Sequence, residues 1–361
     1  MRIALVHDYL NQHGGAERVL EVFMNMFPEA PVYTLIANLE KMPERFRQAD
    51  VRTSFIQNIP FSKNHYKKML SLFPLAVEQM DLRGYDLVLS SSSAFVKGVL
   101  TNPNQLHICY CHTPMRYVWD LYHQYLEEIT NPFFSMALPR ILHKIRIWDR
   151  VSSQRPDHYI SNSHNVSARI RKYYNRESTV VHPPVSFAKP SAATTNEDFF
   201  LIVSRLIPYK RIDLVIEAFN KLNWPLVIIG DGYDKGRLEK LAGPTVKLLG
   251  YQSDQIIHEH YAKCKAFILA GEEDFGITPL EAQAHGKPVI AFGKGGALET
   301  VVAESTGLFF NEPSVDSLIS ALLRFQNVRF DPLQIRTHAD KFNEERFKKE
   351  IKVCIDQLMR K

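Results

Sequence analysis

Short apolar runs, each bounded by turn-forming residues, recur along the first half of the chain. Between the first two runs, residues 16–27 carry apolar side chains at the spacing of one helix face. Runs of this length and composition predict buried β-strands. The expected strands are residues 2–9, 32–38, 85–92, 107–114, 158–163 and 179–185. Buried strands that alternate with helices predict a parallel, doubly wound α/β sheet.

A second series of strands and helices follows residues 186–198, which are small and polar and predict a linker. Its expected strands are residues 199–206, 225–232, 246–250, 266–270 and 288–293, and its expected helices are residues 211–222, 234–243, 253–264, 297–304, 315–325 and 342–359. The last helix should pack on the protein, because it has a one-sided apolar stripe. The stripe comprises Phe347, Ile351, Cys354, Ile355 and Leu358. We expect two Rossmann-like domains that face a central cleft: residues 1–185, joined by the C-terminal helix 342–361, and residues 199–341.

Composition narrows the class of protein. With 361 residues, of which 45% are hydrophobic and 23% charged, the chain is typical of a two-domain globular protein. The longest apolar runs are strand-sized, and a strand follows Met1 directly, so we expect neither a membrane span nor a signal peptide. The four cysteines fit neither a disulfide framework nor a zinc site, which favours a reduced, cytosolic chain. A net charge of +5 favours an anionic partner such as a nucleotide, an acidic lipid or a nucleic acid.

Ligands of open parallel sheets bind beyond the carboxyl ends of the strands, so the residues that follow each strand indicate the site. The first strand leads to Gly14 and Gly15 at the start of a helix. Paired glycines suit an anion or a sugar there, although a tight turn alone would also select glycine. Because the segment is not GxGxxG and no acidic residue ends the second strand, a nicotinamide cofactor is not expected.

His112 lies at the end of the strand 107–114. A histidine in this place suits either a structural hydrogen bond or a role in the site. Arg116, Trp119 and Asp120 follow it and suit either an acceptor site or the packing of the next helix.

The second series offers cations and glycine turns at its strand ends. Arg205 and Lys210 follow its first strand and suit a diphosphate, with solvated loop charges as the alternative. Two turns at the ends of neighbouring strands, residues 230–232 and 249–251, offer backbone contacts that suit a nucleotide base.

The stretch 271–286 crosses an acidic, glycine-bearing loop into a helix expected to start at Thr278. Glu273 lies in the loop and Glu281 in the helix, and carboxylates accept hydrogen bonds from sugar hydroxyls. The helix N-terminus can also donate to an anion. Thr278 and Glu281 form a capping box with Pro279 at the first helical position, so Glu281 suits closure of the helix as well as a ligand.

Four blocks in this order carry a resemblance to a known family. They are GGAE at residues 14–17, YCHTPMRYVWD at 110–120, SRLIPYKR at 204–211 and EDFGITPLE at 273–281. Over essentially its whole length the chain resembles the family 4 glycosyltransferases, which have the GT-B fold; the last block is the E-x7-E motif of that family. The chain looks most like bacterial mannosyltransferases of O-antigen and exopolysaccharide assembly.

The resemblance implies a retaining, metal-independent hexosyltransferase that needs no cofactor. The expected donor is GDP-mannose, with UDP- or ADP-sugars as alternatives, and the expected acceptor is a glycan or lipid-linked glycan of bacterial surface polysaccharide synthesis. The implied catalytic residues are His112, Arg205, Lys210 and Glu273. The implied substrate-binding residues are Gly14, Gly15, Gly230, Asp231, Gly250, Tyr251, Gly276, Ile277, Thr278 and Glu281. The implied acceptor residues are Glu17, Arg116, Trp119 and Asp120.

Residues 61–74 and 139–150 mix basic with aromatic and aliphatic side chains. Such segments suit the anionic inner face of the cell membrane, and lipid-linked acceptors of the resembling family favour a peripheral membrane role. The alternative is that both segments pack on the N-terminal domain with solvated basic faces.

Two other classes of function remain open. A nucleotide-sugar epimerase of the same architecture would need no acceptor. A nucleic-acid binder would interleave aromatic and basic residues on a sheet face or a recognition helix, whereas the cations here gather at strand ends and in the two basic segments, so no nucleic acid is expected.

Overall fold

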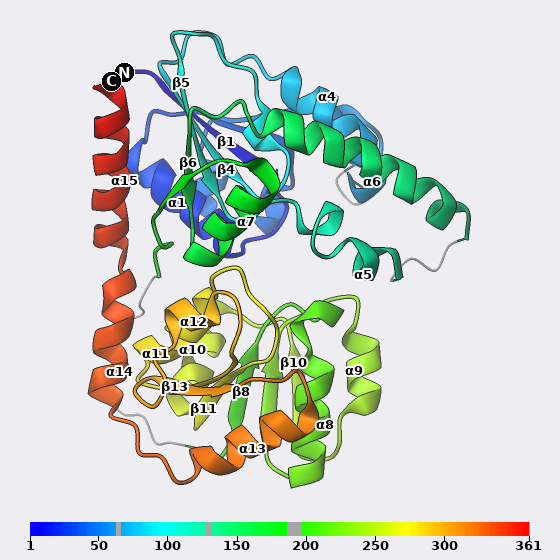
Figure 1. Ribbon diagram of the computed structural model, residues 1–361, viewed down its shortest axis with the longest axis vertical. Coiled ribbons are helices and arrows are strands. Elements are labelled where there is room, and N and C mark those ends of the chain that lie inside the picture. The colour runs from blue at the N-terminus through cyan, green and yellow to red at the C-terminus, as the bar shows by residue number, and fades with distance from the viewer. Residues whose placement is uncertain (63–65, 128–131, 186–196, 361) are drawn as a thin grey trace. The chain divides into compact units, whose positions relative to one another are not determined.

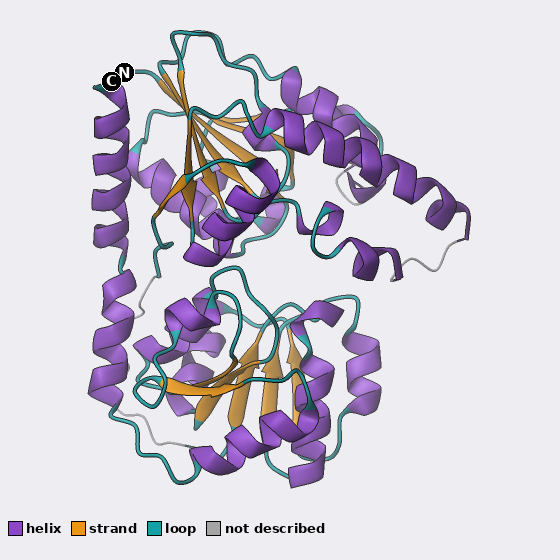
Figure 2. Cartoon of the chain, in the orientation of Figure 1, coloured by secondary structure: helices purple, strands orange, loops and turns teal. Residues whose placement is uncertain are grey.

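A computed structural model describes residues 1–62, 66–127, 132–185 and 197–360, and the chain divides into two compact units. The first unit comprises Met1–Pro184 and Lys348–Lys361, and the second comprises Val185–Phe347. Most of the predicted linker, residues 186–196, lies outside the described residues. Each unit is a sheet covered by helices (Figures 1 and 2).

The first unit contains a seven-stranded parallel sheet in the order β3-β2-β1-β4-β5-β6-β7. Its strands are β1 (Ile3–Leu10), β2 (Val32–Ala37), β3 (Val51–Thr53), β4 (Leu87–Ser92), β5 (Leu106–Cys111), β6 (His158–Ser161) and β7 (Ser178–Val180). Its helices are α1 (Gly15–Met26), α2 (Glu44–Arg47), α4 (Phe73–Glu78), α5 (Tyr122–Glu127), α6 (Pro132–Ser152) and α7 (His164–Tyr174). The strand order reverses between β1 and β4, which is where ligands of such sheets bind.

The two faces of the first sheet carry different side chains, because residues alternate along a strand. Ala4, Val6 and Val88 belong to the hydrophobic cluster that includes α4 and α6. On the opposite face, Tyr110 of β5 packs edge-on against Phe23 of α1. His7 and Ser91 pair in register with each other, and Ser91 pairs with Tyr110, so all three share the face that α1 covers.

The second unit contains a six-stranded parallel sheet in the order β10-β9-β8-β11-β12-β13. Its strands are β8 (Phe200–Val203), β9 (Leu226–Ile229), β10 (Val246–Gly250), β11 (Ala266–Leu269), β12 (Val289–Phe292) and β13 (Gly307–Phe310). Its helices are α8 (Ile212–Leu222), α9 (Lys235–Leu241), α10 (Asp254–Lys263), α11 (Ile277–Ala284), α12 (Ala297–Thr300), α13 (Val315–Phe325) and α14 (Pro332–Ala339). This is the strand order of dinucleotide-binding sheets, with the reversal between β8 and β11.

Most expected elements are present, and Ser253 caps α10 as its side chain suggests. Strands β3 and β13, which lie at the edges of their sheets, were not predicted. The predicted helix 297–304 ends at Thr300, since the backbone becomes extended at Val301. Helix α15 (Glu344–Met359) buries Phe347, Ile351, Cys354 and Ile355, as its stripe predicts.

Candidate functional site

The loops that follow β8 and β11 meet beside the strand reversal of the second sheet. Lys210, in the 3-10 turn Pro208–Lys210, forms an ion pair with Glu273 of the loop after β11. Both side chains are mostly covered, at 11% and 19% exposure. Arg205 lies on the same loop as Lys210, is exposed, and donates from Nη2 to the Tyr209 hydroxyl at 3.2 Å. The fold thus places cations for an anionic group next to a carboxylate that can only accept hydrogen bonds.

Close backbone contacts hold the Glu273 loop in place. Gly296 donates its N–H to the carbonyl of Glu273 at 2.9 Å, and a Cβ added at Gly296 would lie only 2.3 Å from Cα of Phe275. On the other side, a Cβ added at Gly271 would lie 2.8 Å from Cα of Lys210. Two of the glycines in this region are therefore required for close packing of three neighbouring loops.

Substitution of Gly296 by alanine should lower the free energy of unfolding by about 1–3 kcal/mol, because the new methyl group overlaps the Phe275 backbone. Urea unfolding followed by circular dichroism measures the change. Gly236→Ala is a matched control, since Gly236 lies inside α9 and has nothing within 4 Å of an added Cβ. That control should gain about 0.5–1 kcal/mol. Equal stabilities of the two variants would contradict the tight packing of the loop.

The predicted capping box at Thr278 is wrong. Helix α11 begins at Ile277, and its N-cap is Gly276, which adopts the left-handed conformation with φ of 95° and makes no side-chain cap hydrogen bond. Since glycine alone reaches this conformation readily, the helix starts one residue before Thr278. Glu281 is instead buried at 5% exposure and accepts a hydrogen bond from the Tyr261 hydroxyl of α10 at 2.9 Å.

The two turns predicted to hold a base lie side by side, as expected. Strands β9 and β10 are neighbours, and Gly230 donates its N–H to the carbonyl of Gly250 at 2.9 Å. Asp231 accepts from the N–H of Gly232 at 2.9 Å, and Tyr251 is 81% exposed. The exposed aromatic ring of Tyr251 beside these turns suits stacking on a planar ligand.

In the first unit, His112 is held by a chain of hydrogen bonds on the face that α1 covers. Its Nε2 lies 2.8 Å from Oγ of Ser91, which lies 3.1 Å from Nδ1 of His7. Nε2 of His7 is 3.6 Å from a carboxylate oxygen of Glu17, and the other oxygen of Glu17 accepts from the N–H of Gly14 at 2.8 Å. Burial lowers the pKa of His112 to about 3, so its imidazole is neutral at physiological pH.

Glu17 has a supporting position in this unit. It is the third residue of α1 and closes a capping arrangement with the backbone of Gly14, while Gly15 is the first residue of the helix. Burial alone would raise the pKa of Glu17, but the hydrogen bond and charge of His7 and the N–H of Gly14 lower it below its ordinary value. Its role as an acceptor ligand remains a prediction.

Asp8, which follows His7 on β1, binds a turn of backbone. Its two carboxylate oxygens accept four N–H groups, from Ser93 at 2.6 Å, Ala94 at 2.9 Å, Phe95 at 2.7 Å and Val96 at 3.0 Å. These bonds fix the segment after β4 to the end of β1, at the strand reversal of the first sheet. The sequence places Asp8 at a strand end but does not reveal its partners.

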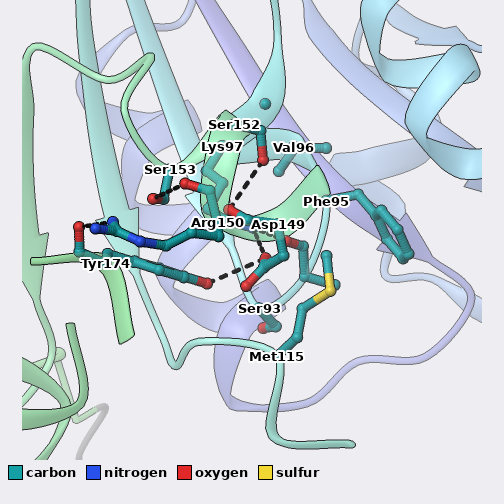
Figure 3. Close-up of polar contacts among 12 residues, drawn as sticks. Ser93, Phe95, Val96, Lys97, Met115, Asp149, Arg150, Ser152, Ser153 and Tyr174 are labelled. Atoms are coloured by element: carbon teal, nitrogen blue, oxygen red, sulfur yellow. Dashed lines mark hydrogen bonds and ion pairs between the residues drawn. The ribbon is translucent and has the colours of Figure 1, made fainter. Parts of the chain in front are cut away.

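Trp119, one of the predicted acceptor residues, contacts a buried ion pair that the sequence did not reveal. Lys97 and Asp149 are 1% and 0% exposed and pair with each other, and the Tyr174 hydroxyl donates to Asp149 at 3.2 Å (Figure 3). The other oxygen of Asp149 accepts from Nε1 of Trp119 at 2.7 Å. Trp119 also stacks on Tyr173, with ring centroids 4.9 Å apart.

Arg116 and Asp120, the other acceptor candidates, bond to each other at 3.2 Å. Asp120 also lies 3.5 Å from a guanidinium nitrogen of Arg169 on α7. The segment that follows His112 therefore contacts both α6 and α7. Its side chains contribute to packing, which was the alternative to an acceptor site.

The structure describes the basic segment 139–150 throughout but the basic segment 61–74 only in part. Lys63 in the segment 61–74 lies outside the described residues. In the segment 139–150, Leu142 and Ile145 are buried in the core, and Trp148 donates to Glu78 at 2.9 Å. These apolar residues therefore pack on the first unit. Within the described ranges, no helix combines the length and the apolar character that a bilayer span requires.

The curated proteins that are similar to this chain are named for the transfer of different sugars. A GDP-mannose-dependent alpha-mannosyltransferase of Mycobacterium tuberculosis is 37% identical over 107 residues, which are 29% of this chain and 28% of that protein. A lipopolysaccharide 1,2-N-acetylglucosaminetransferase of Salmonella typhimurium is 33% identical over 144 residues, 34% of this chain and 38% of that protein. The matched region thus spans well under half of each relative.

Solved structures share the fold over the whole chain. HepE of Anabaena in complex with UDP and glucose has a TM-score of 0.73 at 17% identity and covers 99% of each chain. Sucrose-phosphate synthase of Thermosynechococcus elongatus has a TM-score of 0.74 at 17% identity, again over 99% of each chain. With its two parallel-sheet units, the chain has the GT-B fold.

Two family models divide the chain between them. The model described as Glycosyltransferase Family 4 matches residues 13–189, and the model described as Glycosyl transferases group 1 matches residues 186–342. Taken together, the two models account for residues 13–342, and the chain belongs to the family 4 glycosyltransferases.

Proposed function

We propose that the protein transfers a sugar from a nucleoside-diphosphate sugar to a glycan or lipid-linked glycan acceptor. The observation that carries this proposal is the pairing of Lys210 with Glu273 at the strand reversal of the second sheet. A diphosphate competes for the cation and sugar hydroxyls compete for the carboxylate, so one donor molecule replaces the ion pair with two matching interactions. Arg205, on the same loop, adds a second cation for the diphosphate.

The reaction forms a bond between the acceptor oxygen and the anomeric carbon and breaks the bond from that carbon to the diphosphate. The acceptor hydroxyl proton leaves with the diphosphate oxygen, and attack from the leaving-group face retains the anomeric configuration. Arg205 and Lys210 neutralise the charge that develops on the diphosphate, in place of a metal ion or other cofactor. Product NMR that shows the inverted anomer would contradict retention.

For the donor we propose GDP-mannose. The Mycobacterium tuberculosis relative, which is GDP-mannose-dependent, supports this donor. The alternative is a UDP-sugar, because the HepE structure contains UDP. The relative from Salmonella typhimurium is a lipopolysaccharide enzyme and supports a role in bacterial surface polysaccharide synthesis.

A thermal-shift panel of GDP-, UDP- and ADP-sugars tests the donor. GDP-mannose should raise the melting temperature most, since a ligand that binds only the folded state stabilises it by about 2.7 kcal/mol at a hundred times its Kd. A larger shift with a UDP-sugar would replace the donor assignment. No shift with any nucleotide sugar would contradict the proposed function. Conversion of the donor to an epimer without acceptor would favour the epimerase.

We also propose that α6 binds an anionic membrane face with a stripe other than its core-facing one. The exposed residues of this stripe are Met136, Arg140, Lys144, Ile147 and Val151. They recur at helical spacing and combine basic with apolar side chains, which suits an anionic lipid surface near a lipid-linked acceptor.

The protein should therefore sediment with phosphatidylglycerol vesicles at low salt. The double variant Arg140→Glu/Lys144→Glu should lose most of this binding, because each basic residue near an anionic surface contributes about 1 kcal/mol. Lys221→Glu on α8 is the matched control. Wild-type protein that stays in the supernatant at low salt would contradict the membrane role.

A further inference from the structure

We propose that His7 and Ser91 fix the tautomer of His112, so that Nδ1 of His112 carries a lone pair and accepts a hydrogen bond from a substrate hydroxyl. The inference about the substrate rests on the proposed function, whereas the tautomer itself does not. His7 and Ser91 are positioning residues in this proposal, because they act through His112.

The donor and acceptor of each hydrogen bond in this series follow from Glu17, the carboxylate at one end. Glu17 is a carboxylate that can only accept, because His7 and the N–H of Gly14 hold its pKa below the ordinary value. The nearby carboxylate therefore favours the proton on Nε2 of His7, which lies 3.6 Å from the Glu17 oxygen. In a neutral imidazole the other nitrogen, Nδ1, then has a lone pair.

The remaining bonds follow one after another. Nδ1 of His7 accepts from the Ser91 hydroxyl at 3.1 Å, which uses the only proton that the hydroxyl has. Ser91 must then accept from Nε2 of His112 at 2.8 Å, so Nε2 carries the His112 proton. Because burial keeps His112 neutral, with its pKa lowered to about 3, Nδ1 has no proton.

Nδ1 of His112 is the open end of the chain. Among the residues that the structure describes, it has no hydrogen-bond partner, and His112 retains 9% exposure at the end of β5. A bare lone pair suits the hydroxyl of a sugar as donor and disfavours a carbonyl or a phosphate oxygen at that place. The same chain reaches Gly14 through Glu17, so the glycine turn and the sugar contact are set by one network.

A second Ser–His pair in the same sheet provides a matched control. Ser90 directly precedes Ser91 on β4, and its Oγ lies 2.8 Å from Nε2 of His107 on β5. Both side chains are fully buried, and burial lowers the pKa of His107 to about 3 as well. The Ser90 pair has no link to His7 or Glu17 among the hydrogen bonds of the described chain.

The test is long-range ¹H–¹⁵N NMR of the histidine rings in the free protein at pH 8, with His112 assigned through the His112→Gln variant. We expect the Nε2–H tautomer in the wild type. His7→Gln keeps a donor for Glu17 and an acceptor for Ser91 and should leave that tautomer unchanged. His7→Leu removes the acceptor, so the Ser91 hydroxyl should turn to His112 and shift it to the Nδ1–H tautomer. Ser90→Ala should leave the His112 signals unchanged.

An Nδ1–H tautomer in the wild type would overturn the proposal, and so would a His7→Leu protein whose His112 tautomer is unchanged. If transfer is active, His7→Leu should lower kcat/KM about tenfold, as expected for one lost hydrogen bond, and His7→Gln should restore most of it. If the proposed function is wrong, the result differs: the tautomers are as expected, but the wild type transfers no sugar.

Discussion

Replacement of Arg205 or Lys210 by alanine should lower kcat by about a hundredfold or more, the largest effect on activity that we expect. The reason is that a preorganised cation stabilises charge that appears on the leaving diphosphate only in the transition state. In Lys210→Ala the loss should fall mainly on kcat, although Glu273 also loses its partner in the free protein. Steady-state transfer from the nucleotide sugar identified by thermal shift measures the effect.

The control for these variants is Lys221→Ala. Lys221 lies on α8 of the same unit, is exposed, and forms a surface ion pair with Asp316 at 3.4 Å. Loss of such a pair has little effect on stability or activity. Turnover of Arg205→Ala and Lys210→Ala close to that of Lys221→Ala would remove the diphosphate assignment.

Disruption of the buried Lys97–Asp149 pair should cause the largest loss of stability. Lys97→Met leaves a buried carboxylate without its cation, and Asp149→Asn leaves a buried ammonium group without its anion. Each single variant should lose about 3–5 kcal/mol of unfolding free energy, measured by urea denaturation.

The double variant Lys97→Met/Asp149→Asn distinguishes a charge effect from a packing effect. It removes both charges but keeps an oxygen that can accept from Trp119 or Tyr174. We expect it to be more stable than either single variant, because no uncompensated charge stays buried. Losses that simply add would show that the ion pair itself is not coupled.

The structure adds ion pairs between residues that are far apart in the sequence, which local sequence patterns do not predict. Strand ends are predictable from local patterns, so the loops that carry Arg205, Lys210 and Glu273 were predicted at the ends of their strands. That Lys210 pairs with Glu273 depends on the order of strands, because the two residues are 63 positions apart. Lys97 and Asp149, 52 positions apart, belong to no local pattern at all.

Local patterns also failed where the backbone leaves the common conformations. Thr278, Pro279 and Glu281 satisfy the sequence rules of a capping box, yet the left-handed Gly276 starts the helix one residue earlier. Strand β3 has one apolar residue, Val51, so it shows no apolar run in the sequence. The residues proposed to bind a sugar or nucleotide were predicted from strand ends and family resemblance, and their hydrogen-bond partners came only from the structure.

The four hydrogen bonds of Asp8 occupy a turn of backbone at the strand reversal of the first sheet. Successive N–H groups in a turn at a strand reversal make the usual cradle for a phosphate. In the first unit the chain fills this cradle with its own carboxylate, so Ser93 through Val96 have no N–H left to offer to a nucleotide. Asp8 thus fills the cradle at the reversal of the first sheet, which agrees with the proposal that the donor diphosphate binds at the reversal of the second sheet.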